Sequence, residues 1–366
     1  MITVSFACDG AVAPYRIGEG VLREIAGLLA EDLNGRRAFV VTDTNVGPLY
    51  GEEIARRLEA PCLQLPAGEE HKRWRSVERI AQWLLAHDAE RGSLLVAVGG
   101  GVVTDTAGFA AAVTLRGLPW VAVPTTLLGM VDAALGGKTG IDLDEGKNLI
   151  GAFWAPRAIV ADPLVLATLD RRQLRAGLAE AVKSAMIAPS SLEHVLDSHL
   201  APVAAGDPLQ AQELVAGCAR VKSEIVGLDA RESGPRQALN LGHTLAHGLE
   251  AATSYAGFLH GEAVAWGLLA VLRLARDRGL LSTADALAWA DRIRLLAPLP
   301  ALSGLGWDEV APYIARDKKR DRGRVGWVLP RLGGVVLDVG VSGPEAAAVY
   351  AQLQSLPAEG PFTALF

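Results

Sequence analysis

Three histidines that lie close together in the sequence, with one distant acid, have the chemistry of a metal site. His243 and His247 are four residues apart, so they share one face if this segment is helical. We place His260 on a loop before another helix, and Glu180 is an acid within an otherwise apolar predicted helix. Two imidazoles and a carboxylate that leave open coordination positions form a catalytic zinc site, which polarises bound oxygen. The pattern predicts a divalent metal, although histidine pairs also occur as hydrogen-bonded structural residues.

A second group of residues has the chemistry of a nucleotide site. Three glycines at 99–101 follow the apolar run 94–98, and Asp43 follows the run 37–42. Glycines that leave a parallel strand let backbone N–H groups approach a phosphate, and the N-terminus of a following helix attracts the anion. An acid just past a parallel strand is placed to bind ribose hydroxyls. The GxGxxG fingerprint is absent, so a plain tight turn and a helix N-cap stay open as structural alternatives.

Polar residues continue after the next apolar run, at 120–123. Thr125 and Thr126 come directly after this run, at the carboxyl end where open α/β sheets bind ligands. Lys138 and Lys147 each adjoin a glycine, and small neighbours let an anion approach a lysine. These lysines suit a phosphate pocket, and the alternative is two solvated loop lysines.

The elements that must position these residues divide the chain into two kinds of sequence. Apolar runs that read as strands alternate with helical spacing, as at 77–87, in the first half, which predicts a parallel sheet with crossover helices. Later segments have helical spacing and few strand signals, with one short β pair at 325–329 and 335–337; the helical segments are 174–187, 209–226 and 263–275. At 366 residues, two domains are expected, and we predict them at 1–170 and 171–366.

Composition limits the class of protein. The net charge of −6 argues against broad nucleic-acid binding, which needs a basic face. Cys8, Cys62 and Cys218 are far apart and form no CxxC, which indicates reduced thiols. No basic segment followed by an apolar run opens the sequence, and no apolar stretch is long enough to span a membrane. We therefore expect a cytoplasmic protein that binds neither membrane nor nucleic acid.

An ordered series of polar motifs closely resembles the 3-dehydroquinate synthase family. The motifs extend from about residue 40 to 330, so the resemblance covers most of the chain. They are PAGEEHK at 66–72, GGGVVTDTAGF at 99–109, RGLPWVAVPTTLLGMVDAALGGKTGIDLDEGKNLIGAFWAP at 116–156, GLAEAVKSAMI at 177–187, RQALNLGHTLAH at 236–247, FLHGEAVAWG at 258–267 and DKK at 317–319.

The resemblance implies a fold and a reaction. The fold is an α/β N-terminal Rossmann-like NAD domain followed by an all-α C-terminal domain, with the active site between them, in a homodimer. The reaction converts 3-deoxy-D-arabino-heptulosonate 7-phosphate to 3-dehydroquinate and phosphate, a step of the shikimate pathway. It proceeds by transient oxidation with NAD, phosphate elimination, re-reduction and intramolecular aldol closure, so NAD+ is regenerated in each turnover.

The resemblance also implies roles for individual residues. Zinc, with cobalt as the alternative ion, would be held by Glu180, His243 and His260, which makes His247 a substrate contact. NAD would contact Asp43, Glu69, Lys72, Gly101, Val102, Val103, Thr104, Asp105, Thr125, Thr126, Lys138, Lys147, Val165 and Thr168. The substrate phosphate would contact Lys138, Asn148, Lys183, Asn240 and His247, with Arg116 reaching in from the neighbouring subunit. The substrate carboxylate would contact Lys222, Arg236 and Lys318, and Glu232 and Asp132 would surround the reacting hydroxyls.

Thr104 is a departure from the family pattern, which usually has glycine there. Threonine would strain the loop if that position needs positive φ, and its hydroxyl could donate to a cofactor oxygen if it does not. Other sugar-phosphate cyclases are rivals, namely those that make 2-deoxy-scyllo-inosose, 2-epi-5-epi-valiolone or an amino analogue of dehydroquinate. Most of these lack the carboxylate that Lys222 and Arg236 would bind, but the amino analogue keeps it. A metal-dependent polyol dehydrogenase and a non-catalytic scaffold are the more distant rivals.

Overall fold

The computed structural model of the chain describes residues 1–8, 10–316 and 326–366. These residues form two compact units, each of which takes two segments of the chain. Unit 1 consists of Met1–Leu169 and Asp207–Ala230, and unit 2 consists of Asp170–Gly206 and Arg231–Phe366. The predicted boundary at residue 170 therefore lies close to the point where the chain first passes from unit 1 to unit 2. The segment 207–230, however, groups with unit 1 and not with the predicted second domain.

Unit 1 is built on a seven-stranded sheet with the order β1-β2-β9-β6-β5-β3-β4. Neighbouring strands are parallel except for β1 and β2, which form an antiparallel pair at one edge. The strands are β1 (Ile2–Cys8), β2 (Ala11–Ile17), β3 (Ala38–Asp43), β4 (Cys62–Leu65), β5 (Leu94–Gly99), β6 (Trp120–Pro124) and β9 (Ala158–Ala161). The three strands expected from apolar runs are β3, β5 and β6. Every residue of β5 and β6 is buried, as in parallel sheets covered on both faces.

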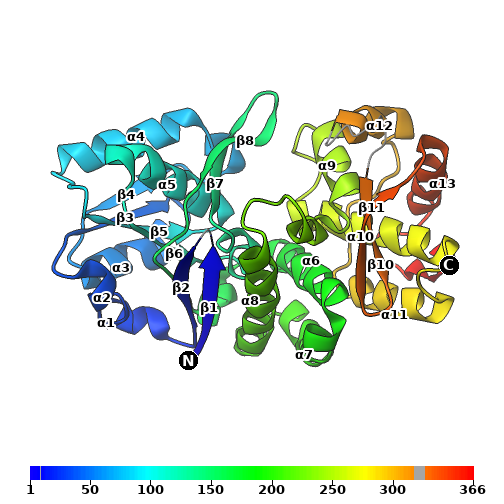
Figure 1. Cartoon of the computed structure of the whole chain (residues 1–366), viewed down its shortest axis with the longest axis horizontal. Helices are drawn as coiled ribbons and strands as arrows, with labels where there is room; N and C mark the ends of the chain where they lie inside the picture. The colour runs from blue at the N-terminus through cyan, green and yellow to red at the C-terminus, as the bar shows by residue number, and fades with distance from the viewer. Residues whose placement is uncertain (9, 317–325) are drawn as a thin grey trace. The chain divides into compact units, whose positions relative to one another are not determined.

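Helices cover both faces of this sheet (Figure 1). Helices α4 (Trp74–Ala86) and α5 (Gly101–Val113) lie on one side, and α1 (Ile25–Leu28), α2 (Ala30–Leu33) and α3 (Glu52–Arg57) lie on the other. Helix α8 (Ala211–Leu228) packs against β1, and its Ser223 hydroxyl donates to the carbonyl of Ser5 over 2.8 Å. A separate antiparallel hairpin, β7 (Lys138–Leu143) with β8 (Gly146–Phe153), packs on α5.

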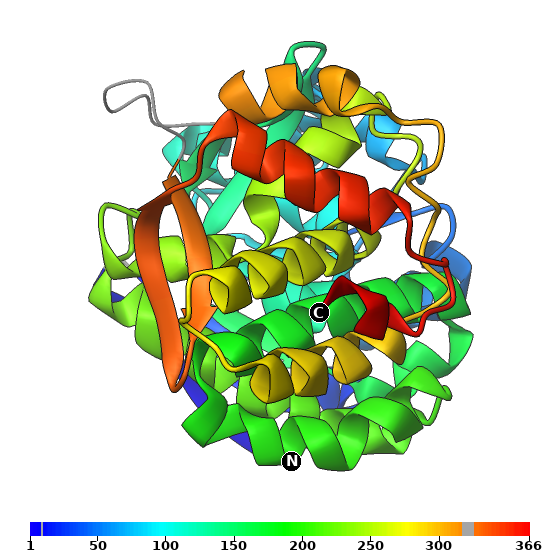
Figure 2. The ribbon, with the colours of Figure 1, turned by 90° about the vertical axis from the view of Figure 1, so that its right-hand side faces the viewer.

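Unit 2 is mainly helical, with one hairpin along an edge (Figure 2). Its helices are α6 (Arg171–Ile187), α7 (Pro189–Ala204), α9 (His243–Ala252), α10 (His260–Asp277), α11 (Thr283–Arg294), α12 (Trp307–Arg316) and α13 (Gly343–Gln354). The antiparallel strands β10 (Gly326–Arg331) and β11 (Gly334–Gly340) form the short β pair predicted near the end. Among the described residues, none of the helices has the length and apolar character needed to cross a membrane.

Candidate metal and cofactor sites

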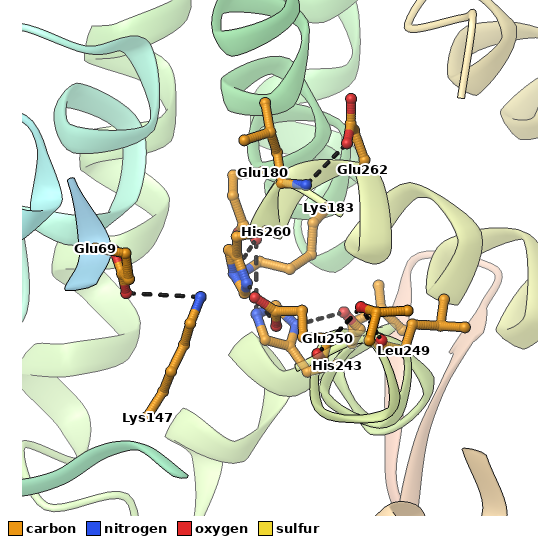
Figure 3. A network of polar contacts seen from close by, with 12 residues as sticks. Glu69, Lys147, Glu180, Lys183, His243, Leu249, Glu250, His260 and Glu262 are labelled. Carbon is orange, nitrogen blue, oxygen red and sulfur yellow. Dashed lines mark hydrogen bonds and ion pairs between the residues drawn. The ribbon is translucent and has the colours of Figure 1, made fainter. Parts of the chain in front are cut away.

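Three side chains from three helices of unit 2 meet at one point (Figure 3). Glu180 lies in the middle of α6, and His243 and His260 are the first residues of α9 and α10. Glu180 Oε1 is 3.6 Å from His243 Nε2 and 3.5 Å from His260 Nε2. One ligand atom from each residue lies within 4.8 Å of the other two, and among the described residues this is the group that could hold a metal ion. The structure thus brings together the three residues expected to bind zinc.

Two glycines of α10 explain how the three helices come so close. A Cβ built on Gly261 would lie 1.8 Å from the carbonyl oxygen of Ala176 in α6. A Cβ on Gly267 would lie 1.9 Å from the carbonyl oxygen of Gly242, the residue that precedes α9. Only glycine allows this backbone-to-backbone approach, so α10 packs directly on the elements that carry the other two predicted ligands.

The start of α10 differs from the expectation that His260 lies on a loop. That expectation was wrong, because the helix already begins at His260. Glu262 explains the earlier start, since its Oε2 accepts a hydrogen bond of 2.8 Å from the backbone N–H of Leu259. The same carboxylate binds Arg172 of α6 bidentately, over 2.6 and 2.9 Å. This pair holds the first turn of α10 against the start of α6.

The charges of the group follow from burial and from neighbouring ions. Burial disfavours the charge of Glu180, but Lys183 and His260 outweigh it and lower the pKa of Glu180 to about 2. Burial, with the charge of Lys183, holds the pKa of His243 well below its usual value. Burial also lowers the pKa of His260, but Glu250 and Glu180 outweigh it and raise that pKa to about 10 in the metal-free protein.

The donor set fits a zinc ion. Glu180 is fully buried; its Oε2 pairs with the Lys183 ammonium, and its Oε1 has no hydrogen bond among the described residues. Two atoms that each lie about 2.1 Å from a tetrahedral metal are about 3.4 Å apart. The spacings of 3.5 and 3.6 Å between Glu180 and the two imidazoles are close to that value. A cation at this point would be coordinated by Glu180 Oε1, the oxygen that faces both imidazoles, while Oε2 pairs with Lys183.

The other predicted residues of unit 2 lie on neighbouring elements. The ring of His247 is 5.4 Å from that of His243 and 6.5 Å from that of His260, between ring centroids. The short helical segment η8 (Pro235–Asn240) carries the buried Arg236, and its Asn240 donates over 2.6 Å to Glu232. Lys318 lies outside the described residues.

In unit 1, the predicted cofactor residues gather at the carboxyl edge of the sheet. Gly99 ends β5 beside Pro124 of β6, and the N–H of Thr125 donates over 2.9 Å to the carbonyl of Gly99. Helix α5 begins at Gly101 and has no side-chain cap at its N-terminus. The first amides of a helix lack intrahelical partners, so this end can receive a phosphate. The hydroxyl of Thr125 is buried without a hydrogen bond among the described residues, which also fits a polar ligand here.

Two residues on this edge resolve questions that the sequence left open. Asp43 ends β3, and its Oδ1 accepts hydrogen bonds from the N–H groups of Asn45 and Val46, at 2.9 and 2.8 Å. It therefore caps the following turn whether or not it also binds ribose. Thr104 lies within α5, where its hydroxyl donates to the carbonyl of Gly101 over 3.2 Å. The helical backbone at Thr104 removes the predicted strain, and the hydroxyl faces its own helix.

Lys72, which is itself buried, joins predicted cofactor and phosphate residues in one network. Its ammonium is 2.7 Å from Asp105 Oδ2 and 2.6 Å from Asn148 Oδ1. Burial opposes its charge, but Asp105 outweighs burial and raises the pKa of Lys72. Asn148 has a left-handed backbone, with φ of 55°, and its N–H donates over 2.8 Å to Asp142.

The remaining predicted residues of unit 1 lie around this network or at the surface. Lys222 of α8 donates over 2.7 Å both to the backbone oxygen and to the carboxylate of Asp132. Lys147 is 3.6 Å from Glu69 (Figure 3). Lys138 and Lys147, which we predict to suit a phosphate pocket, both lie on strands of the β7–β8 hairpin and not on loops. Arg116 is exposed, with φ of 68°, and the hydroxyl of Tyr50 contacts Val165 and Thr168.

Sequence comparison gives the family to which these sites belong. A model of the N-terminal part of 3-dehydroquinate synthase matches residues 62–176, and a model of its C-terminal part matches residues 177–320. The 3-dehydroquinate synthase of Solibacter usitatus is 40% identical over 341 residues, which cover 92% of this chain and 95% of that protein. The chain belongs to the 3-dehydroquinate synthase family.

Solved structures of other sugar-phosphate cyclases are similar to this member of the 3-dehydroquinate synthase family. The crystal structure of a 2-deoxy-scyllo-inosose synthase complexed with carbaglucose-6-phosphate, NAD+ and Co2+ has a TM-score of 0.87 at 25% identity, covering 95% of this chain and 99% of that one. The structure of a 2-epi-5-epi-valiolone synthase from Streptomyces hygroscopicus with NAD+ and Zn2+ bound has a TM-score of 0.84 at 31% identity, covering 95% and 98%. The fold class expected from the resemblance is thereby confirmed.

Two buried acids at the sites of this family member escaped the sequence analysis. Glu250 lies 3.2 Å from Nδ1 of His260, and Asp142 accepts from the backbone of Asn148. The sequence spacing could have identified Glu250, because it lies seven residues after His243 and so on the same face of a helix. No sequence pattern could have identified Asp142, because an acid in a hairpin is usually solvated.

Proposed function

We propose that this chain is a zinc- and NAD-dependent 3-dehydroquinate synthase, which converts 3-deoxy-D-arabino-heptulosonate 7-phosphate to 3-dehydroquinate and phosphate. The observation that carries the proposal is the group of Glu180, His243 and His260, in which the buried Oε1 of Glu180 faces both imidazoles. Such a group suits a Lewis-acid metal at a hydroxyl of the substrate, which is the chemistry that a sugar-phosphate cyclase needs.

The two cofactors would supply chemistry that side chains lack. Zinc at the Glu180 group polarises an alcohol or carbonyl oxygen, and NAD+ accepts a hydride and later returns it. The chain would hold NAD+ at the start of α5, with Thr125 and Asp43 at the same sheet edge. Because the cofactor is restored in each turnover, the protein needs to bind it and orient it and does not need to exchange it.

Basic residues from both units would bind the two anionic ends of the substrate. Lys183, Asn240 and His247 of unit 2, with Lys138 and Asn148 of unit 1, would contact the phosphate. Holding the anions at both ends fixes which hydroxyl faces the metal, so that binding energy orients the reacting atoms.

The carboxylate end distinguishes dehydroquinate synthase from the carboxylate-free cyclases. Arg236 and Lys222 are both buried cations. Lys222 pairs with Asp132 of unit 1 over 2.7 Å, and its ammonium is a point charge. We assign Arg236, whose planar guanidinium matches a carboxylate, as the principal contact for the substrate carboxylate.

We further propose that the active form is a homodimer in which Arg116 contacts the substrate phosphate bound to the partner subunit. Arg116 is exposed, and it and Leu115 both have left-handed backbones, with φ of 68° and 50°. A monomeric chain with full activity in sedimentation and dilution experiments would contradict this part of the proposal.

The test is incubation of the zinc-loaded chain with the heptulosonate phosphate and a catalytic amount of NAD+. We expect several molecules of phosphate released per molecule of NAD+, with dehydroquinate as the product and no accumulation of NADH. Formation of one NADH for each polyol molecule oxidised would instead show that the chain is a dehydrogenase. Faster turnover of glucose 6-phosphate or sedoheptulose 7-phosphate would show one of the carboxylate-free cyclases.

A further inference from the structure

Glu250 is a buried acid that contacts one of the proposed zinc ligands without belonging to the ligand group. It lies on α9, two turns after His243, and only 2% of its surface is exposed. Its Oε2 is 3.2 Å from Nδ1 of His260, while Nε2 of the same ring is 3.5 Å from Glu180 (Figure 3). The two nitrogens of His260 therefore face two different carboxylates, one inside the proposed metal site and one behind it.

We propose that Glu250 is a positioning residue of the metal site, which orients His260 and sets the tautomer that can bind zinc. Because the Nδ1–H group of His260 donates to Glu250, the lone pair available to a metal lies on Nε2, which faces Glu180, once that nitrogen has given up its proton. A hydrogen-bonded carboxylate also strengthens the imidazole as a donor to a metal. This inference rests on the proposed function, because it takes Glu180, His243 and His260 as the metal ligands.

The other proposed histidine ligand is held differently. Nδ1 of His243 is 3.1 Å from the backbone oxygen of Leu241, and its Nε2 also faces Glu180. Both rings thus present Nε2 to the same point, but His243 is oriented by a neutral carbonyl and His260 by a carboxylate. A backbone carbonyl cannot be removed by substitution, whereas Glu250 can, so the contribution of the acceptor is measurable at His260.

The position of Glu250 also links two helices of the site. His243 and Glu250 are seven residues apart on α9 and so share one face of that helix. Helix α9 therefore supplies one ligand itself and the acceptor that orients a second ligand on α10. The glycine contact of α10 with the residue before α9 sets the distance between these helices, and Glu250 sets the rotation of the His260 ring.

Three variants test this assignment. Glu250→Ala removes the acceptor, and Glu250→Gln keeps an acceptor of the same shape but removes its charge. Glu345→Gln is the matched control, because Glu345 is a carboxylate of the same unit that pairs with Arg278 over 2.8 Å and has no contact with the proposed ligands. The measurements are the zinc dissociation constant by competition with a chelator and the visible absorption spectrum of the Co2+-loaded protein.

We expect Glu250→Ala to weaken zinc binding by about 10- to 100-fold and to change the Co2+ spectrum. Glu250→Gln should fall between Glu250→Ala and the wild type, and Glu345→Gln should bind zinc within about twofold of the wild type. Thermal unfolding of the zinc-free proteins identifies a variant that fails to fold; Glu250→Gln, which has the same shape as the wild-type residue, then decides the outcome alone.

Zinc binding by Glu250→Gln and Glu250→Ala within about twofold of the wild type, with an unchanged Co2+ spectrum, would overturn the assignment. A wild-type chain that binds neither Zn2+ nor Co2+ would overturn both this inference and the proposed metal site. A wild-type chain that binds zinc but does not convert the heptulosonate phosphate would refute the proposed function and leave the assignment of Glu250 to be decided by the variants.

Discussion

Replacing Gly261 by alanine should disrupt the metal site from outside the ligand group. Gly261 follows His260 directly in α10, and its Cα faces the backbone of Ala176 in α6. An added methyl group would lie 1.8 Å from the carbonyl oxygen of Ala176 and 2.7 Å from its Cα. Both of these atoms are backbone atoms, so no rotation of a side chain can relieve the overlap, and α10 has to move away from α6.

The size of that movement can be taken from the structure. Real Cβ atoms essentially never approach a non-bonded heavy atom closer than 3.0 Å, so the methyl group must withdraw by about 1.2 Å. A metal site tolerates deviations of only about 0.2 Å in ligand distance, so His260 would lose its place beside Glu180. Overpacking of this kind typically costs about 1–3 kcal/mol. For a domain of 150–250 residues, each kcal/mol lowers Tm by about 2–4 °C.

The assay separates the two effects. Gly261→Ala should lower the Tm of the zinc-free protein by roughly 2–12 °C, as measured by thermal unfolding. The zinc dissociation constant, measured by chelator competition, should rise by more than about tenfold. Gly343→Ala is the control, because a Cβ on Gly343, at the start of α13, meets no atom within 4 Å. If Gly261→Ala bound zinc and unfolded like the wild type, the close approach of α6 and α10 would not be what positions His260.

Three further predictions concern single residues. His247→Ala should keep a full equivalent of zinc but lose turnover, and loss of the metal on elemental analysis would instead make His247 a ligand. Zinc binds neutral imidazole, so with the pKa of His260 at about 10 in the metal-free protein, binding must displace one proton. Apparent zinc affinity should therefore rise about tenfold per pH unit between about pH 7 and 9, and calorimetry in buffers of different ionisation enthalpy should show this proton. Asp43→Asn should weaken NAD+ binding by about tenfold or more with unchanged Tm, because asparagine still caps the turn; an unchanged NAD+ dissociation constant would leave Asp43 only its capping role.

The central strands were predictable because a strand that is buried on both faces of a sheet has a continuous run of apolar residues. The apolar runs at β3, β5 and β6 are separated by segments with helical spacing, and buried parallel strands are the interpretation that fits this alternation best. Strands β1 and β2, the antiparallel pair at one end of the sheet, were missed, since Pro14 and Arg16 interrupt the apolar pattern of β2. The sequence predicted a parallel sheet, but it predicted neither the register that places Gly99 beside Pro124 nor the number of strands.

The grouping of α8 with unit 1 could not be inferred from local sequence. Its spacing predicts a helix and says nothing about which core the apolar face joins. In the structure that face packs against β1, a strand about two hundred residues earlier, through contacts such as Ser223 with Ser5. Consecutive segments usually belong to one domain, and here the chain passes from unit 1 to unit 2 and back before its last part.

The predicted cofactor and substrate residues also turn out to be less separate than the sequence implied. The family resemblance assigned Lys72 to NAD and Asn148 to the substrate phosphate, but the Lys72 ammonium binds Asn148 and Asp105 at once. Removing Lys72 would leave the half-buried Asp105 without this counter-ion and Asn148 without this donor, so both ligand sites would change together. Effects of substitutions within such a network are not additive. An altered affinity for one ligand in a Lys72 variant would therefore not locate Lys72 at that ligand, and only a double-mutant cycle with Asn148 would separate direct contact from positioning.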